Sequence, residues 1–394
     1  MPWTETRVMD QKIQLLNAWM DGHSITELAD HFGISRKTVY KWVGRYEAEG
    51  VTGLTERSRA PHHCPGKVDE AVTRHIIETK LAHRSFGPKK VMDLLRREQP
   101  EVVWPADSTA GELLKRAGLV SKRRVKRCYP ADPQSFDLAE AGNNAIWSVD
   151  YKGQYPLASK GWCYPLTITD NASRFLLGCE GLTSTRYELA RPVFERVFRA
   201  FGLPEAILSD NGAPFASRSA GGLSRLSMWW VQLGIRVHRI RPGKPTQNAR
   251  HERMHGSLNR AIGRQLRGAG LARQLSLLSA YQDEYNQQRS HEGLGRRTPA
   301  SVYRRSLRHY SGVLPCMEYD VGQLVRQVRH NGEIKLAGQR VYISELLAGQ
   351  PVALRTVGND REEVRFGAHL LGYIDQRSMK LESACHWHDD RLTK

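Results

Sequence analysis

The chain has few cysteines and no long apolar run, and both absences limit what it can be. Its six cysteines are spread over 394 residues without a CxxC pair, so neither a disulfide framework nor a zinc ribbon is indicated. No apolar run reaches the length of a membrane span, and polar, charged sequence follows Met1. We therefore expect a soluble, cytoplasmic protein without a membrane partner.

Acidic residues are also in short supply. Lysine and arginine total 59 against 41 aspartates and glutamates, which gives a net charge of +18. An excess of this size favours a polyanionic partner, most often nucleic acid, and a basic but solvated surface is the alternative. The length allows about two to four domains, and the 40% hydrophobic content is typical of globular protein.

Residues 1–60 carry the pattern of a helix-turn-helix domain. A capping box at Ser24 opens the second of three expected helices, Gly33 makes the turn, and Ser35 caps a third helix with a basic first turn. In the first helix we expect four core residues, namely Ile13, Leu15, Leu16 and Trp19. The side chains expected to bind DNA are Ser35, Arg36, Lys37, Thr38, Lys41 and Arg45. A plain three-helix bundle with a solvated basic face is the alternative.

Residues 66–128 predict a second helix-turn-helix-like domain with a basic linker. Gly87-Pro88 opens its middle helix, because proline suits the first helical turn. Asp107 or Ser108 is the expected cap of its third helix. That helix is less basic than its counterpart in the first domain, so base reading is an open question. In the linker, we expect Lys122, Arg123 and Arg124 to follow DNA phosphates.

Residues 140–308 predict an α/β sandwich around a mixed sheet, and three carboxylates fall at the ends of its elements. Asp150 ends the first expected strand and Asp210 ends the fourth, where Asn-Gly breaks an apolar run. An aspartate that only starts a turn is the alternative for Asp210. Glu252 lies in the first turns of a long helix expected over 247–266. We expect the first and fourth strands to be neighbours, with the helix crossing beside them.

Three carboxylates that converge in this way offer hard oxygen ligands. Such ligands suit Mg²⁺, with Mn²⁺ also possible. Two ions about 4 Å apart activate an attacking oxygen and stabilise the leaving oxygen of a phosphodiester. Asp150, Asp210 and Glu252 are therefore the predicted catalytic residues and the predicted ligands of two ions.

Several motifs together resemble an insertion-sequence DDE transposase of the retroviral integrase superfamily. The first three are Trp147-Ser-Val-Asp150, Ser209-Asp-Asn-Gly-Ala-Pro-Phe215 and Gln247-Asn-Ala-Arg-His-Glu-Arg-Met-His255. Tyr285-Asn286, followed by Arg289-Ser-His291 and Thr298-Pro-Ala300, resembles the tail of that core. The resemblance covers nearly the whole chain, and the triad with its flanks is specific.

The resemblance implies a ribonuclease-H-like core in which Asp150, Asp210 and Glu252 hold the metal ions. Water would free a 3′-hydroxyl at a transposon end, and that hydroxyl would attack target DNA. It also implies a homo-oligomer on double-stranded DNA in a bacterial, nucleoid-associated setting. Further candidates for DNA contacts are Lys244, Arg250, His255 and Asn259. For His255, helix packing is the alternative.

Two residues depart from the family pattern. Ala249 stands where glycine is usual and Ser290 stands where proline is usual. If position 249 needed a positive φ, alanine would strain the catalytic loop. If it lies in the helix, alanine is harmless or mildly stabilising, and we expect this second case.

Residues 318–378 are strand-rich and predict a small antiparallel β-barrel. Asn331-Gly332 between two strand-like runs predicts a hairpin. In the family such a module binds DNA or contacts another subunit, and a purely structural barrel is equally open. The expected fold is therefore multidomain, with all-α helix-turn-helix N-terminal domains, an α/β ribonuclease-H-like core and a small all-β C-terminal barrel.

Three functions follow from these patterns. The leading one is a DNA transposase that cleaves 3′ ends and transfers strands. The second is a catalytically decayed or domesticated DNA-binding protein that represses or bridges DNA. A ribonuclease is the weakest of the three, because two helix-turn-helix units point to duplex DNA.

Overall fold

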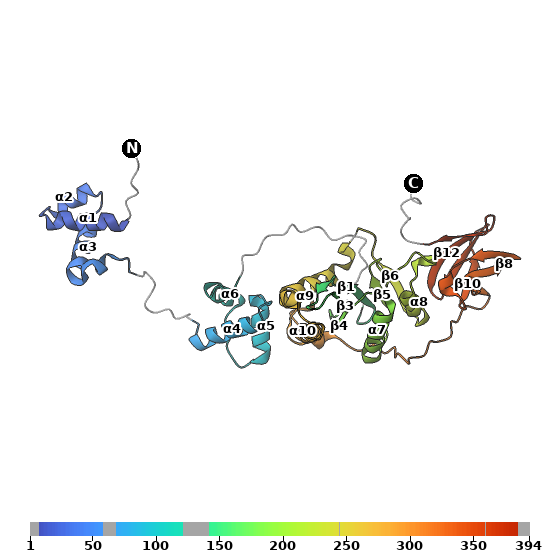
Figure 1. The fold of residues 1–394 in the computed structure, drawn as a ribbon. Coiled ribbons are helices and arrows are strands. Elements are labelled where there is room, and N and C mark those ends of the chain that lie inside the picture. Colours follow the sequence, from blue (N-terminus) through green and yellow to red (C-terminus); the bar gives the residue numbers. More distant parts are fainter. Residues whose placement is uncertain (1–7, 58–67, 121–141, 244, 359, 385–394) are drawn as a thin grey trace. The chain divides into compact units, whose positions relative to one another are not determined.

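A computed structural model describes residues 8–57, 68–120, 142–243, 245–358 and 360–384 (Figure 1). The chain divides into two compact units, Met1–Lys67 and Val68–Lys394. The finer four-domain division expected from the sequence stays a prediction. No helix in the described part of the chain has both the length and the apolar composition of a membrane span.

The first unit contains the three helices expected from its capping residues, α1 (Val8–Met20), α2 (Ile25–His31) and α3 (Arg36–Glu49), followed by the short helix η1 (Gly50–Leu54). The side chain of Ser24 accepts from the backbone of Glu27, whose own side chain accepts from the backbone of Ser24, so the capping box is confirmed. Gly33 makes the turn at φ 62°, and Ser35 caps α3 through the backbone N–H of Thr38.

One core residue of α1 was predicted wrongly. Leu15 and Leu16 are buried, but Ile13 is 39% exposed. Lys12 is buried in its place, because its ammonium donates to the carbonyl of Leu54 at 3.0 Å and lies 3.7 Å from the centroid of the Trp42 ring. A long aliphatic stem can pack where a periodic pattern predicts a smaller apolar residue, provided that its charged end finds partners.

The second helical group is formed by α4 (Glu70–Ala82), α5 (Pro88–Glu98) and α6 (Asp107–Arg116). Proline at the start of α5 is confirmed. The predicted cap of α6 is wrong, because Ala106 is the N-cap residue and makes no side-chain cap bond. Asp107 is instead the first residue of the helix, and its carboxylate accepts from the guanidinium of Arg96 at 2.8 Å.

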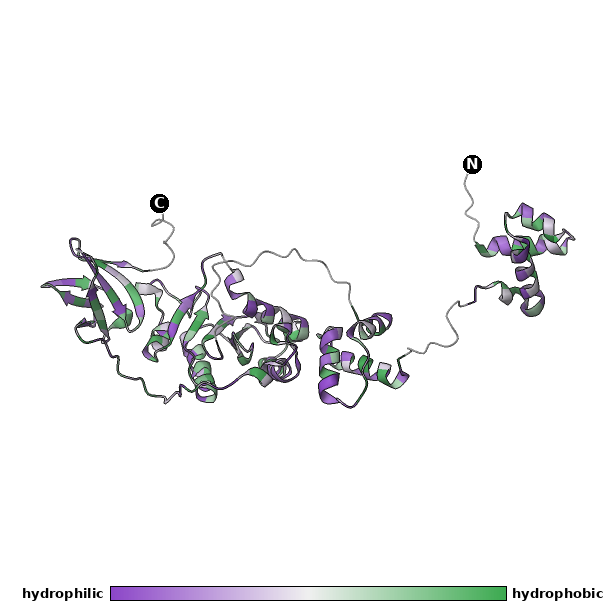
Figure 2. Ribbon diagram, turned by 180° about the vertical axis from the view of Figure 1, so that it is seen from behind, coloured by the Kyte–Doolittle hydropathy of each residue, from purple (hydrophilic) through white to green (hydrophobic). Residues whose placement is uncertain are grey.

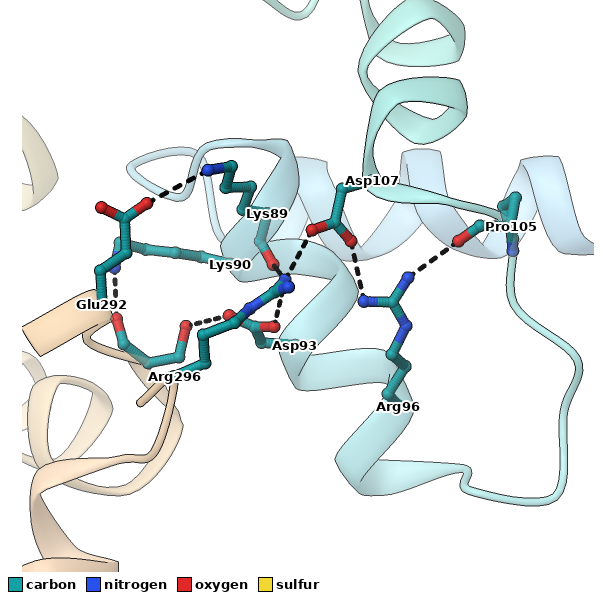
Figure 3. Close-up of polar contacts among 9 residues, drawn as sticks. Lys89, Lys90, Asp93, Arg96, Pro105, Asp107, Glu292 and Arg296 are labelled. Atoms are coloured by element: carbon teal, nitrogen blue, oxygen red, sulfur yellow. Dashed lines mark hydrogen bonds and ion pairs between the residues drawn. The ribbon is translucent and has the colours of Figure 1, made fainter. Parts of the chain in front are cut away.

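Helix α5 docks on residues 290–296 of the α/β core (Figure 3). The guanidinium of Arg296 lies 2.5 Å from Asp93 on α5 and 2.7 Å from Asp107 on α6. The hydroxyl of Ser290 donates to Asp93 at 2.5 Å, and the carbonyl of Ser290 accepts from the ammonium of Lys90. Proline at position 290 could not make the hydroxyl contact, so this departure from the family pattern takes part in the docking surface.

The core is a mixed sheet with helices on both faces. Its strands are β1 (Ile146–Tyr151), β2 (Tyr155–Pro156), β3 (Trp162–Asp170), β4 (Leu176–Leu182), β5 (Ala206–Ser209) and β6 (Arg236–Arg239). The order is β2-β3-β1-β5-β6, with β4 paired to β3. The pairs that β1 makes with β5 and β5 makes with β6 are parallel. The expected adjacency is confirmed for β1 and β5, which are the first and fourth strands when the two-residue β2 is left out.

Helices α7 (Tyr187–Phe201) and α8 (Arg225–Gln232) share one aromatic core with the sheet, in which Trp147, Phe194 and Trp230 are fully buried. Helices α9 (Ala249–Leu266) and α10 (Leu271–Asp283) share a second core. Both hydrophobic and hydrophilic residues are visible along these helices in Figure 2, as expected of helices that bury one face on a sheet. Short helical turns complete the core, namely η2 (Ala220–Gly222), η3 (Pro245–Asn248), η4 (Glu284–Gln288), η5 (Glu292–Leu294) and α11 (Pro299–Val302).

The C-terminal region is built from a five-stranded antiparallel sheet and a separate hairpin. The sheet order is β13-β12-β11-β10-β7, and β8 pairs with β9. The elements are β7 (Leu324–Gln327), β8 (Glu333–Leu336), β9 (Gln339–Tyr342), η6 (Glu345–Leu347), β10 (Pro351–Thr356), β11 (Arg361–Phe366), β12 (His369–Asp375) and β13 (Lys380–Ser383). The sheet and the hairpin share one hydrophobic core, so an all-β region is present.

The predicted hairpin at Asn331-Gly332 is wrong. Gly332 does make a turn, since its N–H donates to the carbonyl of Arg329 at 2.9 Å. The strands on either side nevertheless find other partners, because β7 pairs with β10 and β8 pairs with β9. The tight hairpin turn lies at Ala337-Gly338 instead, where both residues have positive φ, 47° and 83°, as a type I′ turn requires.

Candidate metal centre

Two of the predicted carboxylates come to one edge of the sheet. Asp150 lies near the end of β1, and Asp210 directly follows β5. These strands are parallel, with Ser148 opposite Leu208. Each aspartate lies two residues beyond that pair, so the two carboxylates reach the same edge side by side.

The third carboxylate, Glu252, is exposed and lies in the first turn of α9. Its charge acts on Asp150: burial, then the charges of Asp210 and Glu252, raise the pKa of Asp150 to about 7. Burial also raises the pKa of Asp210, against the N–H of Gly212, which donates to its carboxylate at 3.2 Å. Asp150 and Asp210 are half-buried, and neighbouring carboxylates act on Asp150. Divalent cations fit such a site, because they neutralise the repulsion and bind the hard carboxylate oxygens.

Behind Asp150 lies a buried hydrogen-bond network that joins one face of α9 to one face of β3. The hydroxyl of Thr167 is 2.7 Å from Nε2 of His251 and 2.8 Å from Nε2 of His255. The hydroxyl of Thr169 is 2.8 Å from Nδ1 of His251. Thr167 also donates to the backbone carbonyl of Asp150 at 2.9 Å. The helix that carries Glu252 is therefore tied directly to the strand beside Asp150.

His255 also faces the carboxylate itself, with Nδ1 3.7 Å from Oδ2 of Asp150. Among the described residues, one ligand atom each from Asp150, His251 and His255 lie within 4.8 Å of one another. Burial lowers the pKa of His251 to about 3. Burial, with His251 and Lys152 nearby, also lowers the pKa of His255 well below its ordinary value. Both imidazoles are therefore neutral near pH 7.

From the sequence, His255 is expected to contact DNA or to pack within the protein. It is 2% exposed, which agrees with packing. His251, Thr167 and Thr169 were not singled out at all. Their spacing carried a signal, since the histidines are four apart on one helical face and the threonines two apart on one strand face.

Other predicted DNA contacts in the second unit are placed as follows. Asn259 is exposed, and its side-chain oxygen accepts from the hydroxyl of Tyr155 at 2.6 Å. Arg250 is half-buried and donates to the carbonyl of Asn171 at 3.2 Å. The remaining candidates lie outside the described residues, namely Lys122, Arg123, Arg124 and Lys244. DNA binding by all of them stays a prediction.

In the first unit, the predicted DNA-binding residues of α3 have different surroundings. The hydroxyls of Ser35 and Thr38 lie 2.9 Å apart within the cap, and Arg36 and Lys37 are exposed. Two of the predicted cations lie against the ring of Trp42: the ammonium of Lys41 is 4.5 Å from its centroid and the guanidinium of half-buried Arg45 is 5.1 Å away. Arg36, Lys37 and Lys41 are therefore the exposed cations of this group.

The substitution of glycine by alanine at position 249 is accommodated locally. Ala249 is the first residue of α9, after the N-cap residue Asn248. It is not among the described residues with positive φ. Alanine is therefore unstrained at the start of the helix that carries Glu252, as expected.

Comparisons with known families cover most of the chain in pieces. Residues 140–245 and residues 233–299 each match a family described as Integrase core domain. Residues 11–62 match the family Helix-turn-helix domain, and residues 38–114 match the family Homeodomain-like domain.

Two insertion-element proteins are similar over much of their length. An uncharacterized 39.2 kDa protein of insertion element IS476 from Xanthomonas euvesicatoria is 27% identical over 72% of this chain and 79% of its own. An uncharacterized 31.7 kDa protein of insertion element IS407 from Burkholderia multivorans is 26% identical over 63% of this chain and 87% of its own.

Solved structures of viral integrases are also similar, at low sequence identity. The HTLV-2 integrase catalytic core domain in complex with magnesium is 17% identical, with a TM-score of 0.31 over 41% of this chain and 97% of that chain. The simian T-cell lymphotropic virus intasome is 15% identical, with a TM-score of 0.36 over 75% of this chain and 97% of that chain.

Proposed function

The chain joins helix-turn-helix domains to an integrase core domain, and on that premise we propose that it is a DNA transposase. It binds transposon ends, cleaves at their 3′ ends and transfers them into target DNA, as a homo-oligomer on double-stranded DNA. The observation that carries the proposal is the position of Asp150 and Asp210 at one sheet edge, with the charge of Glu252 acting on Asp150.

In this reaction Asp150, Asp210 and Glu252 hold two Mg²⁺ ions, or Mn²⁺ ions in their place. The bound ions supply activation of the attacking oxygen and stabilisation of the leaving oxygen. Asp150 binds in its ionised form, which bound cations favour over the protonated form. The tie between α9 and β3 fixes the start of α9 against the sheet, and so limits how far Glu252 can move from the two aspartates.

DNA is held by the helical domains and positioned by exposed cations. In the first unit, α3 presents Arg36 and Lys37 beside its capped N-terminus, as a recognition helix does in the major groove. The excess of 18 positive charges over the chain supports the remaining phosphate contacts.

A strand-transfer reaction tests the proposal. The substrate is a labelled duplex of the DNA that borders the coding sequence, mixed with supercoiled target and Mg²⁺. Wild-type protein should give joined products, while Asp150→Asn, Asp210→Asn and Glu252→Gln should each lower the rate by at least about a thousandfold, because each removes a metal ligand. Asp283→Asn, an exposed aspartate at the end of α10, is the control that should keep full activity.

DNA binding is measured in a separate experiment. Lys37→Ala should weaken binding of the same duplex and lower the salt slope by about one for each phosphate that the side chain neutralises in the wild type. If binding is intact but the wild type neither nicks nor joins DNA, and Asp150→Asn changes nothing, the protein is a DNA-binding factor without chemistry.

A further inference from the structure

The network behind Asp150 fixes where the protons of its two histidines lie. Thr167 has a single hydroxyl proton and three polar neighbours, the carbonyl of Asp150 at 2.9 Å and the Nε2 atoms of His251 and His255 at 2.7 and 2.8 Å. A carbonyl oxygen can only accept. The proton of Thr167 therefore goes to that carbonyl, and both imidazoles donate to Thr167 from Nε2.

A neutral imidazole that donates from Nε2 carries a lone pair on Nδ1. In His251 that lone pair accepts the hydroxyl proton of Thr169, 2.8 Å away. In His255 it faces Oδ2 of Asp150 at 3.7 Å. Two acceptor atoms thus face each other beside a carboxylate predicted to bind metal, and a cation between them would satisfy both.

The separation of these two atoms suits a metal ion better than a shared proton. With metal–nitrogen and metal–oxygen bonds of about 2.1 Å, two ligands of one ion lie about 3.0 Å apart at a right angle and about 3.4 Å apart in a tetrahedron. The observed 3.7 Å is within a few tenths of an ångström of that range. A hydrogen bond from a protonated carboxyl to a ring nitrogen would need about 2.7 Å.

We propose that Nδ1 of His255 is a nitrogen ligand of the cation that Asp150 binds, and that Thr167 holds the imidazole in the tautomer that allows it. The carboxylate triad then has a fourth, non-carboxylate member. His251 is excluded from that role, because both of its ring nitrogens are engaged by threonine hydroxyls. The proposal rests on the proposed function only in requiring a divalent cation at Asp150.

A nitrogen ligand changes which ion the site prefers. Imidazole suits Mn²⁺ and later divalent metals better than Mg²⁺, which prefers an all-oxygen shell. We therefore expect His255→Gln to weaken Mn²⁺ binding about tenfold or more while changing Mg²⁺ binding much less. Glutamine keeps an amide nitrogen near the position of Nε2, where it can still donate to Thr167, but has no atom equivalent to the Nδ1 ligand.

Pulsed electron paramagnetic resonance of the Mn²⁺-loaded, full-length protein tests the assignment directly. The wild type should show nitrogen coupling of a ligated imidazole. His251→Gln should keep that coupling, and His255→Gln should lose it while Mn²⁺ remains bound. His255→Asn, which places an amide near the former Nδ1, should recover part of the Mn²⁺ affinity without the imidazole signal. Circular dichroism confirms that each variant is folded.

Three results would overturn the proposal: bound Mn²⁺ without nitrogen coupling in the wild type, coupling that survives His255→Gln, or no Mn²⁺ binding by the wild type. The last result would also remove the carboxylate metal site. Nitrogen coupling in a protein that never joins DNA strands would instead leave the His255 assignment standing and contradict only the proposed transposase function.

Discussion

Replacing Asp150 by asparagine should stabilise the metal-free protein at neutral and alkaline pH. The carboxylate is 18% exposed, and burial together with the charges of Asp210 and Glu252 raises its pKa to about 7. Without a cation, the folded protein must therefore hold a negative charge where its surroundings oppose one. Asparagine has a similar shape and no charge, so it relieves this repulsion.

The sign and size of the effect follow from proton linkage. Between the ordinary pKa of 3.8 and the raised pKa of about 7, the unfolded chain has released the proton of Asp150 and the folded protein has kept it. The folded state thus binds more protons, and its stability falls as pH rises through this window. Once Asp150 is fully ionised, the loss amounts to about 4 kcal/mol, and Asp150→Asn should recover a large part of it.

Urea unfolding in the presence of a chelator measures the difference at about pH 5 and about pH 8. Tryptophan fluorescence, to which the fully buried Trp147 and Trp230 contribute, follows the unfolding of the core. The gain from Asp150→Asn should grow between the two pH values, and the control Asp283→Asn should show no such growth. Saturating Mg²⁺ should shrink the gain, because the ions stabilise the wild type. A variant that is less stable than wild type at the higher pH would refute the reasoning.

Two further predictions concern a close backbone contact at Gly53 and the ion pairs of Arg296. A Cβ added at Gly53 would lie 2.3 Å from the backbone oxygen of Arg45, whereas one at Gly44 in α3 meets nothing within 4 Å. Gly53→Ala should therefore unfold or strongly destabilise the first unit, while Gly44→Ala should stabilise it by about 0.5–1 kcal/mol, and thermal melts of the two variants give the comparison. Arg296→Ala removes the shared partner of the α5 and α6 carboxylates and should speed hydrogen exchange in α5 about fivefold, for a loss of about 1 kcal/mol. Unchanged exchange would mean that the docking does not depend on this ion pair.

Sequence patterns predicted most helices and strands, because the ends of each element are set by residues close to it in the sequence. The caps at Ser24 and Ser35 use donors only three residues away, and the proline expected to open the middle helix of the second domain is the first residue of α5. Which strands pair with each other, in contrast, depends on residues that lie far apart in the chain. Asn331-Gly332 forms its turn, yet β7 pairs with β10, far along the chain, and the predicted hairpin does not form.

The same distinction between local sequence and tertiary structure applies to the residues of the candidate site. The sequence alone indicated Asp150, Asp210 and Glu252, because a carboxylate at the end of an apolar strand or in the first turn of a helix is visible in local pattern. The tertiary structure added the network of Thr167, His251 and His255, whose hydrogen bonds join residues 84 and 88 positions apart. Only the packing of α9 on β3 decides that a ring nitrogen of His255 faces Asp150, since a hydrogen bond between a helix and a strand depends on their relative placement.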